Sequence, residues 1–363
     1  MSEWPTVSVI VPARNEEASL GACLESLVTQ AGVNLEIIVV DDGSVDRTCE
    51  IAQSFPGVRV IDPGPLPSGW SGKNNALVTG AREARAEWLL FTDADTVHRI
   101  GSLARAVAEA QERKAALLSY SPEQEVHQFW EKAVMSVIFA ELASTYRPSQ
   151  VSDPASPAAA ANGQYVLVSR EAYEAVGGHA AVATSLLEDV ALARAVKASG
   201  RKIFFRYGGD AVRTRMYRSF AQMREGWTKN LALLFRSPVR LAMLRLTEFV
   251  LIVGGGTIAV ATGVHGKRPS AVTAAALTVA MYVLFLKRIR RAHFSWDGNV
   301  FSLVGLPLFS YLLLRSKMAH MNGTVSWKGR RYAENRSSAI SYEVRAGRPH
   351  DSRRDAGARA TPN

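Results

Sequence analysis

The chain has 363 residues and a formal net charge of +10, so it is too long for one small domain. Apolar residues make up 47% of it and the mean hydropathy is -0.01, which is high for a soluble protein with 21% charged residues. These values exclude a uniformly soluble chain and indicate that a globular part is joined to a more apolar part. A nucleic-acid partner is not expected, because no recognised binding motif accompanies the positive charge, and we assign that charge to a membrane surface.

Short apolar strands alternate with helical stretches in the first 120 residues. Strands are expected at residues 6–11, 35–40, 58–62, 88–92 and 115–120, with helices at 17–30, 46–54, 100–112 and one ending near 85. This alternation predicts an α/β fold in which helices cover both faces of a mostly parallel sheet. In open sheets of this kind, ligands bind beyond the carboxyl ends of the strands.

Polar clusters follow three of the expected strands, at residues 12–16, 41–44 and 93–95. Asp93 and Asp95 come directly after an apolar strand, where unpaired carboxylates have no structural use, so a divalent cation carrying phosphates is the expected occupant. Asp42 precedes a predicted helix, and its carboxylate is expected either to bind a nucleobase edge or to cap that helix. Clusters that converge on one rim of a sheet predict an active site.

A glycine-containing segment at residues 69–77 places Lys73 near the start of a predicted helix. Glycines let a backbone approach phosphate, so the segment is expected to grip a diphosphate, and an ordinary solvated lysine is the alternative. The spacing of a Walker phosphate loop fails, because Pro67 and Asn74 occupy two of its required positions. Cys23 and Cys49 fit reduced structural thiols and form no metal pattern.

Uncharged apolar runs occur later in the chain, at residues 249–264, 270–286 and 298–314. Each is close to the roughly 17 residues that a membrane-crossing helix needs, and an apolar helical core is the alternative. Basic residues at 287–291 and in the tail after Leu314 both favour the cytosol, which three full crossings cannot satisfy. The run 298–314, with Asp297 at its mouth and Pro307 inside, is therefore expected to be re-entrant or interfacial. The amino terminus carries no signal peptide, so the globular part is expected in the cytosol.

Four segments in order, residues 7–16, 39–44, 92–95 and 187–189, resemble the signature of inverting family 2 glycosyltransferases. The resemblance covers about residues 5–230 and implies a GT-A fold that binds a nucleotide-sugar. Residues 72–73, 214–217, 225–230 and 327–332 also resemble the membrane-bound members that glycosylate carotenoid acids or serve hopanoid-type lipid pathways.

The resemblance implies a role for each matching residue. The general base would be Asp189, and Asp95 would hold Mg²⁺ or Mn²⁺. Donor-binding residues would be Pro12, Ala13, Glu16, Asp42, Lys73 and Asp93. Beyond what the resemblance implies, the candidate acceptor- or phosphate-binding residues are Glu188, Arg213, Arg215 and Trp227.

Alternatives stay open at several of these positions. Asp189 also fits an acid in the first turn of a helix, and an acceptor that is itself a carboxylate would need no base. Interfacial anchoring explains Trp227 and the two arginines equally well. Residues 222–227 depart from the Gln-x-x-Arg-Trp pattern of processive members, so polymer synthesis is not expected.

The sequence thus predicts a catalytic domain at residues 1–230, a membrane-embedded helical region at 231–320 and a basic, partly disordered tail at 321–363. We expect a multi-pass protein of a bacterial cell membrane, with a cytoplasmic catalytic domain, that moves one hexosyl group from a UDP- or GDP-sugar to a lipid-like acceptor. The first alternative is a non-catalytic nucleotide-sugar-binding scaffold or sensor. The second is a nucleotidyltransferase, against which the glycine-free segment 12–16 argues.

Overall fold

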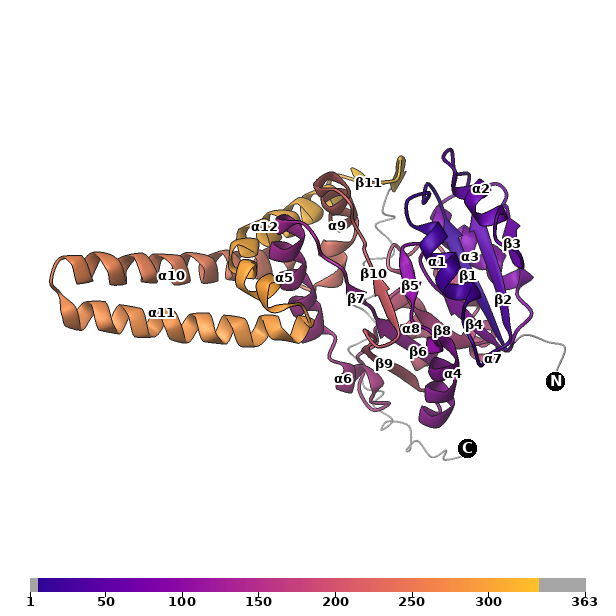
Figure 1. The fold of residues 1–363 in the computed structure, drawn as a ribbon, viewed down its shortest axis with the longest axis horizontal. Helices are drawn as coiled ribbons and strands as arrows, with labels where there is room; N and C mark the ends of the chain where they lie inside the picture. The colour runs from indigo at the N-terminus through magenta and orange to yellow at the C-terminus, as the bar shows by residue number, and fades with distance from the viewer. Residues whose placement is uncertain (1–5, 333–363) are drawn as a thin grey trace, which may run out of the picture.

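The computed structural model describes residues 6–332, and within that range a seven-stranded sheet forms the centre of the N-terminal domain (Figure 1). Its order is β3-β2-β1-β4-β8-β6-β9. Strand β8 pairs antiparallel with β4 and β6, whereas the other neighbours pair parallel, so the mostly parallel sheet is confirmed. The strands are β1 (Val7–Ala13), β2 (Leu35–Asp41), β3 (Val58–Ile61), β4 (Trp88–Phe91), β6 (Leu117–Ser121), β8 (Val166–Ser169) and β9 (Ile203–Tyr207).

Helices cover both faces of this sheet, because successive side chains of a strand point to opposite sides. On β1, Val9 and Val11 pack with α1 and α4, whereas Ile10 packs with α3 and α8. Cys23 lies in the first of these cores, and both it and Cys49 are free thiols, as expected. The helices are α1 (Leu20–Val28), α2 (Thr48–Gln53), α3 (Gly72–Glu83), α4 (Ser102–Arg113), α6 (Pro148–Ser152), α7 (Arg170–Ala175) and α8 (Glu188–Ala198), with a 3-10 turn at Gly178–Val182.

A smaller sheet fixes the chain that leaves β4. Its strands are β5 (Thr96–His98), β10 (Val212–Thr214) and β7 (Glu123–Gln124), with β10 in the middle. The Thr214 hydroxyl donates to the Asp95 carbonyl at 3.1 Å, and the Thr96 hydroxyl donates to the Asp93 carbonyl at 2.7 Å. These bonds hold the loop that carries the Asp93 and Asp95 carboxylates.

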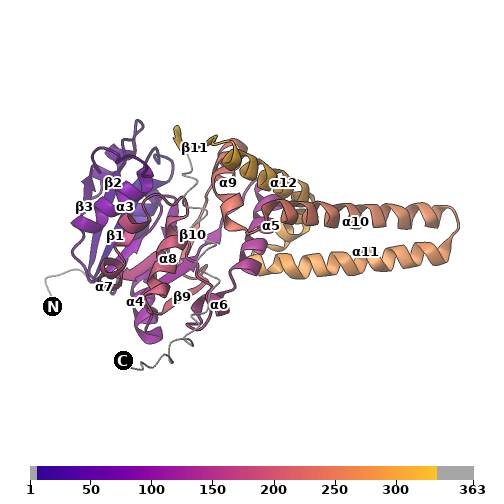
Figure 2. The same cartoon turned by 180° about the vertical axis from the view of Figure 1, so that it is seen from behind.

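A helical region with its own apolar core follows the sheet domain (Figures 1 and 2). Helix α5 packs against α12 and α9, and its Val134 and Ile138 are fully buried, so this helix belongs to the core. Helices α10 and α11 form an antiparallel pair that extends far beyond the rest of the molecule. The bounds are α5 (Phe129–Thr145), α9 (Phe220–Leu234), α10 (Pro238–Val264), α11 (Arg268–Ile289), a 3-10 turn (Arg290–Ala292) and α12 (Trp296–Met321).

Within residues 6–332, three helices are long and apolar enough to cross a membrane. The apolar windows of α10 and α11 have mean hydropathies of 1.6 and 1.8, and only 6% of each is buried in the protein. The window of α12 has a mean hydropathy of 1.4 and is 44% buried, because α5 and α9 cover it. The predicted apolar runs are therefore helices, and the run 298–314 is one continuous helix through Pro307.

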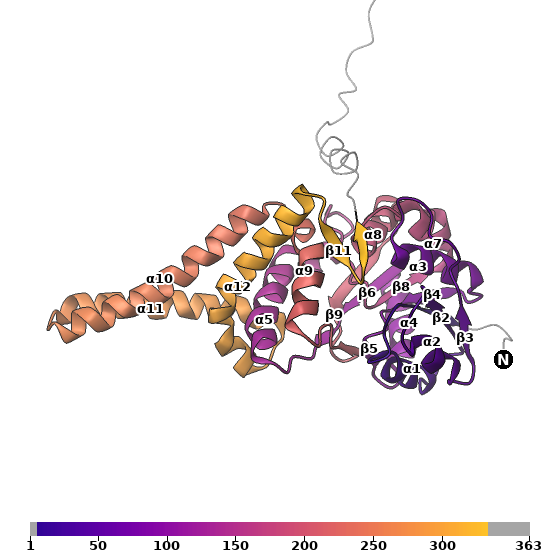
Figure 3. The same cartoon turned by 90° about the horizontal axis from the view of Figure 1, so that it is seen from above.

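The chain returns to the sheet domain after α12 and forms a short hairpin of β11 (Val325–Trp327) and β12 (Arg330–Tyr332). Viewed from above, these strands lie between α9 and the rim of the large sheet (Figure 3). The predicted tail at 321–363 thus includes the last residue of α12 and an ordered hairpin. The rest of the predicted tail, residues 333–363, lies outside the described residues.

Candidate active site

The polar clusters that follow β1, β2 and β4 meet around one cavity of about 190 Å³. This meeting follows from the parallel pairing of the three strands, which brings their carboxyl ends to one edge of the sheet. Helices α3, α8 and α9 and the β11–β12 hairpin complete the wall. The predicted residues that line the cavity are Pro12, Ala13, Glu16, Asp42, Lys73, Asp93, Asp95 and Glu188.

Lys73 lies in the first turn of α3, which begins after Ser71. The Ser71 hydroxyl accepts a hydrogen bond from the Asn74 amide at 3.0 Å and so caps the helix. The Lys73 ammonium lies 2.8 Å from both the Asp93 and the Glu188 carboxylates. Burial lowers the pKa of Lys73, but these carboxylates outweigh burial and hold the pKa well above its usual value. Lys73 is therefore a fixed cation of the site and not a solvated surface lysine.

Asn74 connects α3 to the chain that leads into α8. Its side-chain amide is fully buried and donates to the carbonyl oxygens of Ala183 at 2.7 Å and Ser185 at 3.1 Å. Glu188 begins α8 three residues later. The position of Glu188 opposite Lys73 is therefore set by the same helix that carries Lys73.

Asp95 carries a buried carboxylate oxygen, Oδ1, that has no hydrogen-bond partner among the described residues. Burial, Asp93 and Glu16 together raise the pKa of Asp95 to about 8. An unpaired carboxylate oxygen beside other carboxylates suits a bound cation. No group of three acid, His or Cys side chains within residues 6–332 could hold a metal. The residues therefore fit a metal that takes one protein carboxylate and completes its ligands with substrate phosphates, as Mg²⁺ commonly does.

Asp189 follows Glu188 in the first turn of α8 and does not line the cavity, judged from the residues that the structure describes. Its Oδ2 accepts the Gly163 amide at 2.7 Å, and its Oδ1 accepts the Val190 amide at 2.8 Å. Burial and the neighbouring Glu188 charge raise the pKa of Asp189 to about 6, although Lys73 opposes them. Asp189 is thus a carboxylate that two backbone amides hold in place, and its pKa is raised toward neutral pH.

The other predicted acceptor-side residues lie apart from the cavity. Trp227 is buried in the helical core and donates from its indole nitrogen to the Met135 sulfur at 3.4 Å. Arg213 is exposed and pairs with Glu125 at 2.9 Å. Arg215 lies 3.7 Å from Glu131 at the start of α5. None of the three lines the cavity in the described part of the chain.

Two cations of the β11–β12 hairpin reach the cavity at Asp42 and Glu16, and the sequence analysis did not assign them to the site. Both terminal nitrogens of Arg330 donate to the Asp42 carboxylate, Nη2 to Oδ1 at 3.0 Å. The Lys328 ammonium donates to the Glu16 carboxylate and, at 2.8 Å, to the Arg14 carbonyl oxygen. The only sequence signal for them was the motif at residues 327–332.

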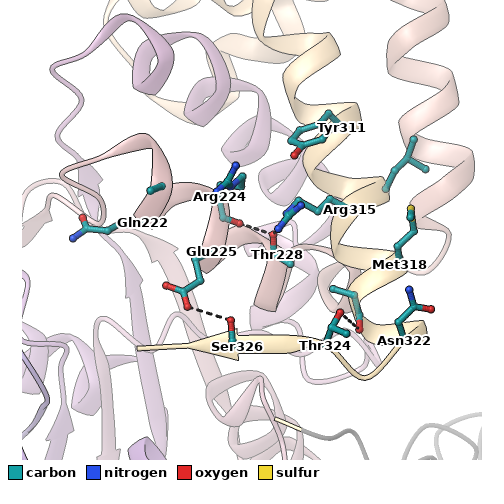
Figure 4. Close-up of a pocket in the computed structure, with 13 residues that line it drawn as sticks. Gln222, Arg224, Glu225, Thr228, Tyr311, Arg315, Met318, Asn322, Thr324 and Ser326 are labelled. Carbon is teal, nitrogen blue, oxygen red and sulfur yellow. Dashed lines mark hydrogen bonds between the residues drawn. The ribbon is translucent and has the colours of Figure 1, made fainter. Parts of the chain in front are cut away.

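A second cavity, of about 810 Å³, lies between α9 and α12 (Figure 4). Tyr311, Leu314 and Met318 give it an apolar side, and Arg224 and Arg315 add positive charge. Among the described residues that line it, Glu225 is the single carboxylate. Of these two cavities, the one at the rim of the sheet is therefore the one that several carboxylates of the described chain line.

The sheet topology defines a GT-A-like α/β domain, which is followed by long apolar helices. Residues 8–177 match the family described as Glycosyl transferase family 2. The chain is 28% identical over 338 residues to 4,4'-diaponeurosporenoate glycosyltransferase from Staphylococcus aureus (strain USA300). The alignment covers 90% of this chain and 88% of that protein. Residues 8–177 therefore form a glycosyl transferase family 2 domain, and the alignment with this relative includes the apolar helices.

A solved structure with a similar fold is the mannosyltransferase PcManGT from Pyrobaculum calidifontis, in complex with GDP-Man and Mn²⁺. The TM-score is 0.51, and the match covers 91% of this chain and 89% of that chain at 18% sequence identity. This likeness extends through the helical region and establishes the GT-A-like fold.

Proposed function

We propose that this glycosyltransferase moves one hexosyl group, with inversion and with the help of Mg²⁺ or Mn²⁺, from a UDP- or GDP-sugar to a lipid-like acceptor. The observation that carries the proposal is the unpaired buried oxygen of Asp95, on the same rim as Asp42 and Lys73. The sheet domain is joined to helices α10 and α11, whose apolar windows are only 6% buried. The homologue that acts on a carotenoid acid and the solved neighbour that binds GDP-Man and Mn²⁺ agree with it.

On the donor side, Asp42, Pro12 and Ala13 are proposed to receive the nucleoside and Asp93 the ribose. Asp95 would hold the metal, which supplies positive charge to the departing diphosphate. Lys73 adds a fixed positive charge at the N-terminus of α3, where the helix dipole also favours an anion. The chain therefore stabilises the negative charge that grows as the glycosidic bond to the nucleotide breaks.

On the acceptor side, Asp189 is proposed to take the proton of the attacking hydroxyl. A base works best when its pKa is close to the working pH, which burial and Glu188 achieve here. The Gly163 amide holds one Asp189 oxygen, so the side chain is oriented before the acceptor arrives. With a carboxylate acceptor no proton needs to move, and Asp189 would only position the substrate.

Helices α10 and α11 are proposed to cross the membrane as a pair. Their 27 and 22 residues make them about 40 and 33 Å long, enough for a hydrocarbon core of about 30 Å. Because they are antiparallel, the chain comes back to the side from which it left. The contact between Arg330 and Asp42 supports this even number of crossings, since it requires the end of α12 to lie on the side of the sheet domain.

The charges at the two ends of the pair support a cytoplasmic sheet domain. Basic residues gather at the end near that domain, at positions 236, 240, 245, 287, 288, 290 and 291, whereas Lys267 and Arg268 lie at the far tip. Lys and Arg prefer the cytoplasmic side of membrane segments. Helix α12, held by α5 and α9, is proposed to lie on the cytoplasmic side against the lipid surface.

The test is product release by detergent-solubilised full-length protein given UDP- and GDP-sugars, Mg²⁺ or Mn²⁺ and a lipid extract of its host. We expect nucleoside diphosphate to be released only when lipid is present. Asp95→Asn should abolish the release, and the exposed Glu87→Gln is the matched control that should keep it. Nucleotide binding without release under any donor would instead support the sensor or scaffold function, and release of pyrophosphate would indicate a nucleotidyltransferase.

A further inference from the structure

The β11–β12 hairpin is fastened to the active-site wall by its own side chains. Val325 is buried, and the Ser326 hydroxyl donates to the Glu225 carboxylate of α9 at 3.3 Å (Figure 4). The Trp327 ring lies 5.8 Å from the Lys229 ammonium, also on α9. The hairpin, at residues 325–332, is thus held against α9 and forms part of the cavity wall.

The turn of this hairpin presents its cations to the cavity. Trp327 and Arg330 pair across the strands, which leaves Lys328 and Gly329 as a two-residue turn. Both turn residues have positive φ, 47° and 77°, as tight hairpin turns require. Lysine rarely adopts this conformation, and residues held in rare backbone conformations gather at functional sites. The backbone therefore places the Lys328 side chain toward Glu16.

The site is shaped to admit the Arg330 guanidinium. Gly72, the first residue of α3, lies against it, and a Cβ at this position would collide with Arg330 and with the Asp42 carboxylate. A glycine is therefore needed where the arginine meets its acid partner. This fit is specific to Arg330, since the neighbouring Arg331 is exposed.

The charges around the cavity balance only when the hairpin is counted. Of the described residues that line it, five are cations and the same number are carboxylates. The cations are Arg14, Lys73, Lys229, Lys328 and Arg330. Without the two hairpin cations, the pocket would hold an excess of negative charge and would repel a nucleoside diphosphate.

The cavity, with the hairpin cations bound to Asp42 and Glu16, is small for a nucleotide-sugar. Its volume of about 190 Å³ is below the roughly 300–1,000 Å³ of small-molecule sites. Arg330 donates hydrogen bonds to the Asp42 carboxylate, the group that is proposed to bind the nucleoside. A donor can therefore enter only if Arg330 leaves Asp42, and a guanidinium released beside a diphosphate binds it through paired hydrogen bonds.

We propose that Lys328 and Arg330 are donor-binding residues, which release Glu16 and Asp42 when the nucleotide-sugar enters and then bind its diphosphate. This assignment rests on the proposed function, because it takes the donor to be a nucleotide-sugar. The assignment makes the β11–β12 hairpin, which follows α12, a part of the donor site. The donor site is then complete only when this hairpin is in place.

The experiment is calorimetric titration of the full-length protein in detergent with UDP and UMP, and with GDP and GMP, in the presence of Mg²⁺. The difference between diphosphate and monophosphate isolates contacts to the second phosphate. We expect Arg330→Gln to weaken diphosphate binding about tenfold or more, with a much smaller effect on the monophosphate. Lys328→Gln should act in the same direction, and Arg331→Gln, in the same hairpin, should bind like wild type.

Two results would overturn the assignment. One is diphosphate binding by Arg330→Gln and Lys328→Gln that is as tight as, or tighter than, in wild type, which would make the hairpin a plug. The other is an equal loss of monophosphate and diphosphate binding. Arg330→Lys, which keeps the charge, should recover part of the affinity and guards against a folding defect. Wild-type protein that binds neither diphosphate would refute both proposals, whereas binding without sugar transfer would refute only the proposed function.

Discussion

The Asp42 carboxylate accepts hydrogen bonds from both terminal nitrogens of Arg330, a residue 288 positions further along the chain. Between the two residues, along the chain, lie the part of the sheet domain that follows β2 and helices α9, α10, α11 and α12. Because of this contact, the chain that follows α12 must lie at the rim of the large sheet. The residues available to the proposed donor site therefore depend on how the apolar helices return the chain.

Replacing Gly72 with alanine should disturb this contact directly. The added Cβ would overlap the Arg330 guanidinium and the Asp42 carboxylate. Overpacking of this kind costs about 1–3 kcal/mol, so we expect a lower apparent melting temperature and weaker nucleoside diphosphate binding. Gly254→Ala is the control, because a Cβ there meets no atom within 4 Å. Unchanged melting and binding in Gly72→Ala would show that the Arg330 contact is not formed in solution.

The activity should fall at acid pH because Asp189 must be ionised to accept a proton. Its pKa is raised to about 6 by burial and by Glu188, so kcat/KM should decrease as the pH drops through about 6. In Glu188→Gln one of the two causes is removed, and the acid limb should move to lower pH. The measurement is a pH–rate profile at saturating Mg²⁺, which keeps Asp95 ionised.

The control for this profile is Glu87→Gln, whose exposed side chain should leave the acid limb in place. An acid limb that does not move in Glu188→Gln would argue against Asp189 as the base. It would favour an acceptor that is already a carboxylate, for which Asp189 only positions the substrate.

The sheet and its rim were predictable because both depend on local pattern. Apolar strands such as β1 alternate with helices, and parallel pairing then forces Asp42, Asp93 and Asp95 to one edge. The contact between Lys73 and Glu188 was not predictable, because it depends on the buried Asn74 side chain that holds the loop before α8.

The hairpin was missed for a similar physical reason. Its strands have three residues each, too few for a pattern of alternation, and they follow a long apolar segment. Nothing local indicates that Arg330 meets Asp42, since that contact depends on how α10, α11 and α12 return the chain. Trp227 is a different case: its place in the motif at residues 225–230 suggested a contact with the acceptor, whereas the structure buries its side chain in the helical core.

A buried charge cluster joins the sheet-domain side of the α10–α11 pair to α5. Glu141 accepts from Arg245 at 2.9 Å and lies 3.2 Å from the Arg288 guanidinium, and its side chain is only 5% exposed. Glu141→Gln would leave Arg245 and Arg288 with Glu248 as their remaining acid partner among the described residues. We expect a loss of about 1–3 kcal/mol, seen as a lower melting temperature in detergent. The exposed Glu25→Gln should melt like wild type, and equal melting of both variants would mean that the cluster does not fasten the pair.

The topology of the apolar helices can be read by thiol labelling in sealed vesicles of known orientation. In a Cys49→Ser background, His265→Cys marks the tip of the α10–α11 pair and Arg331→Cys marks the β11–β12 hairpin; both positions are exposed. If α10 and α11 cross and α12 does not, an impermeant reagent should reach these thiols from opposite sides, with Arg331→Cys on the cytoplasmic face. Labelling of both from one side would mean that the pair lies along the membrane. A thiol at 331 that is reached only from outside the cell would mean that the catalytic domain faces outward, since Arg330 holds the hairpin against Asp42.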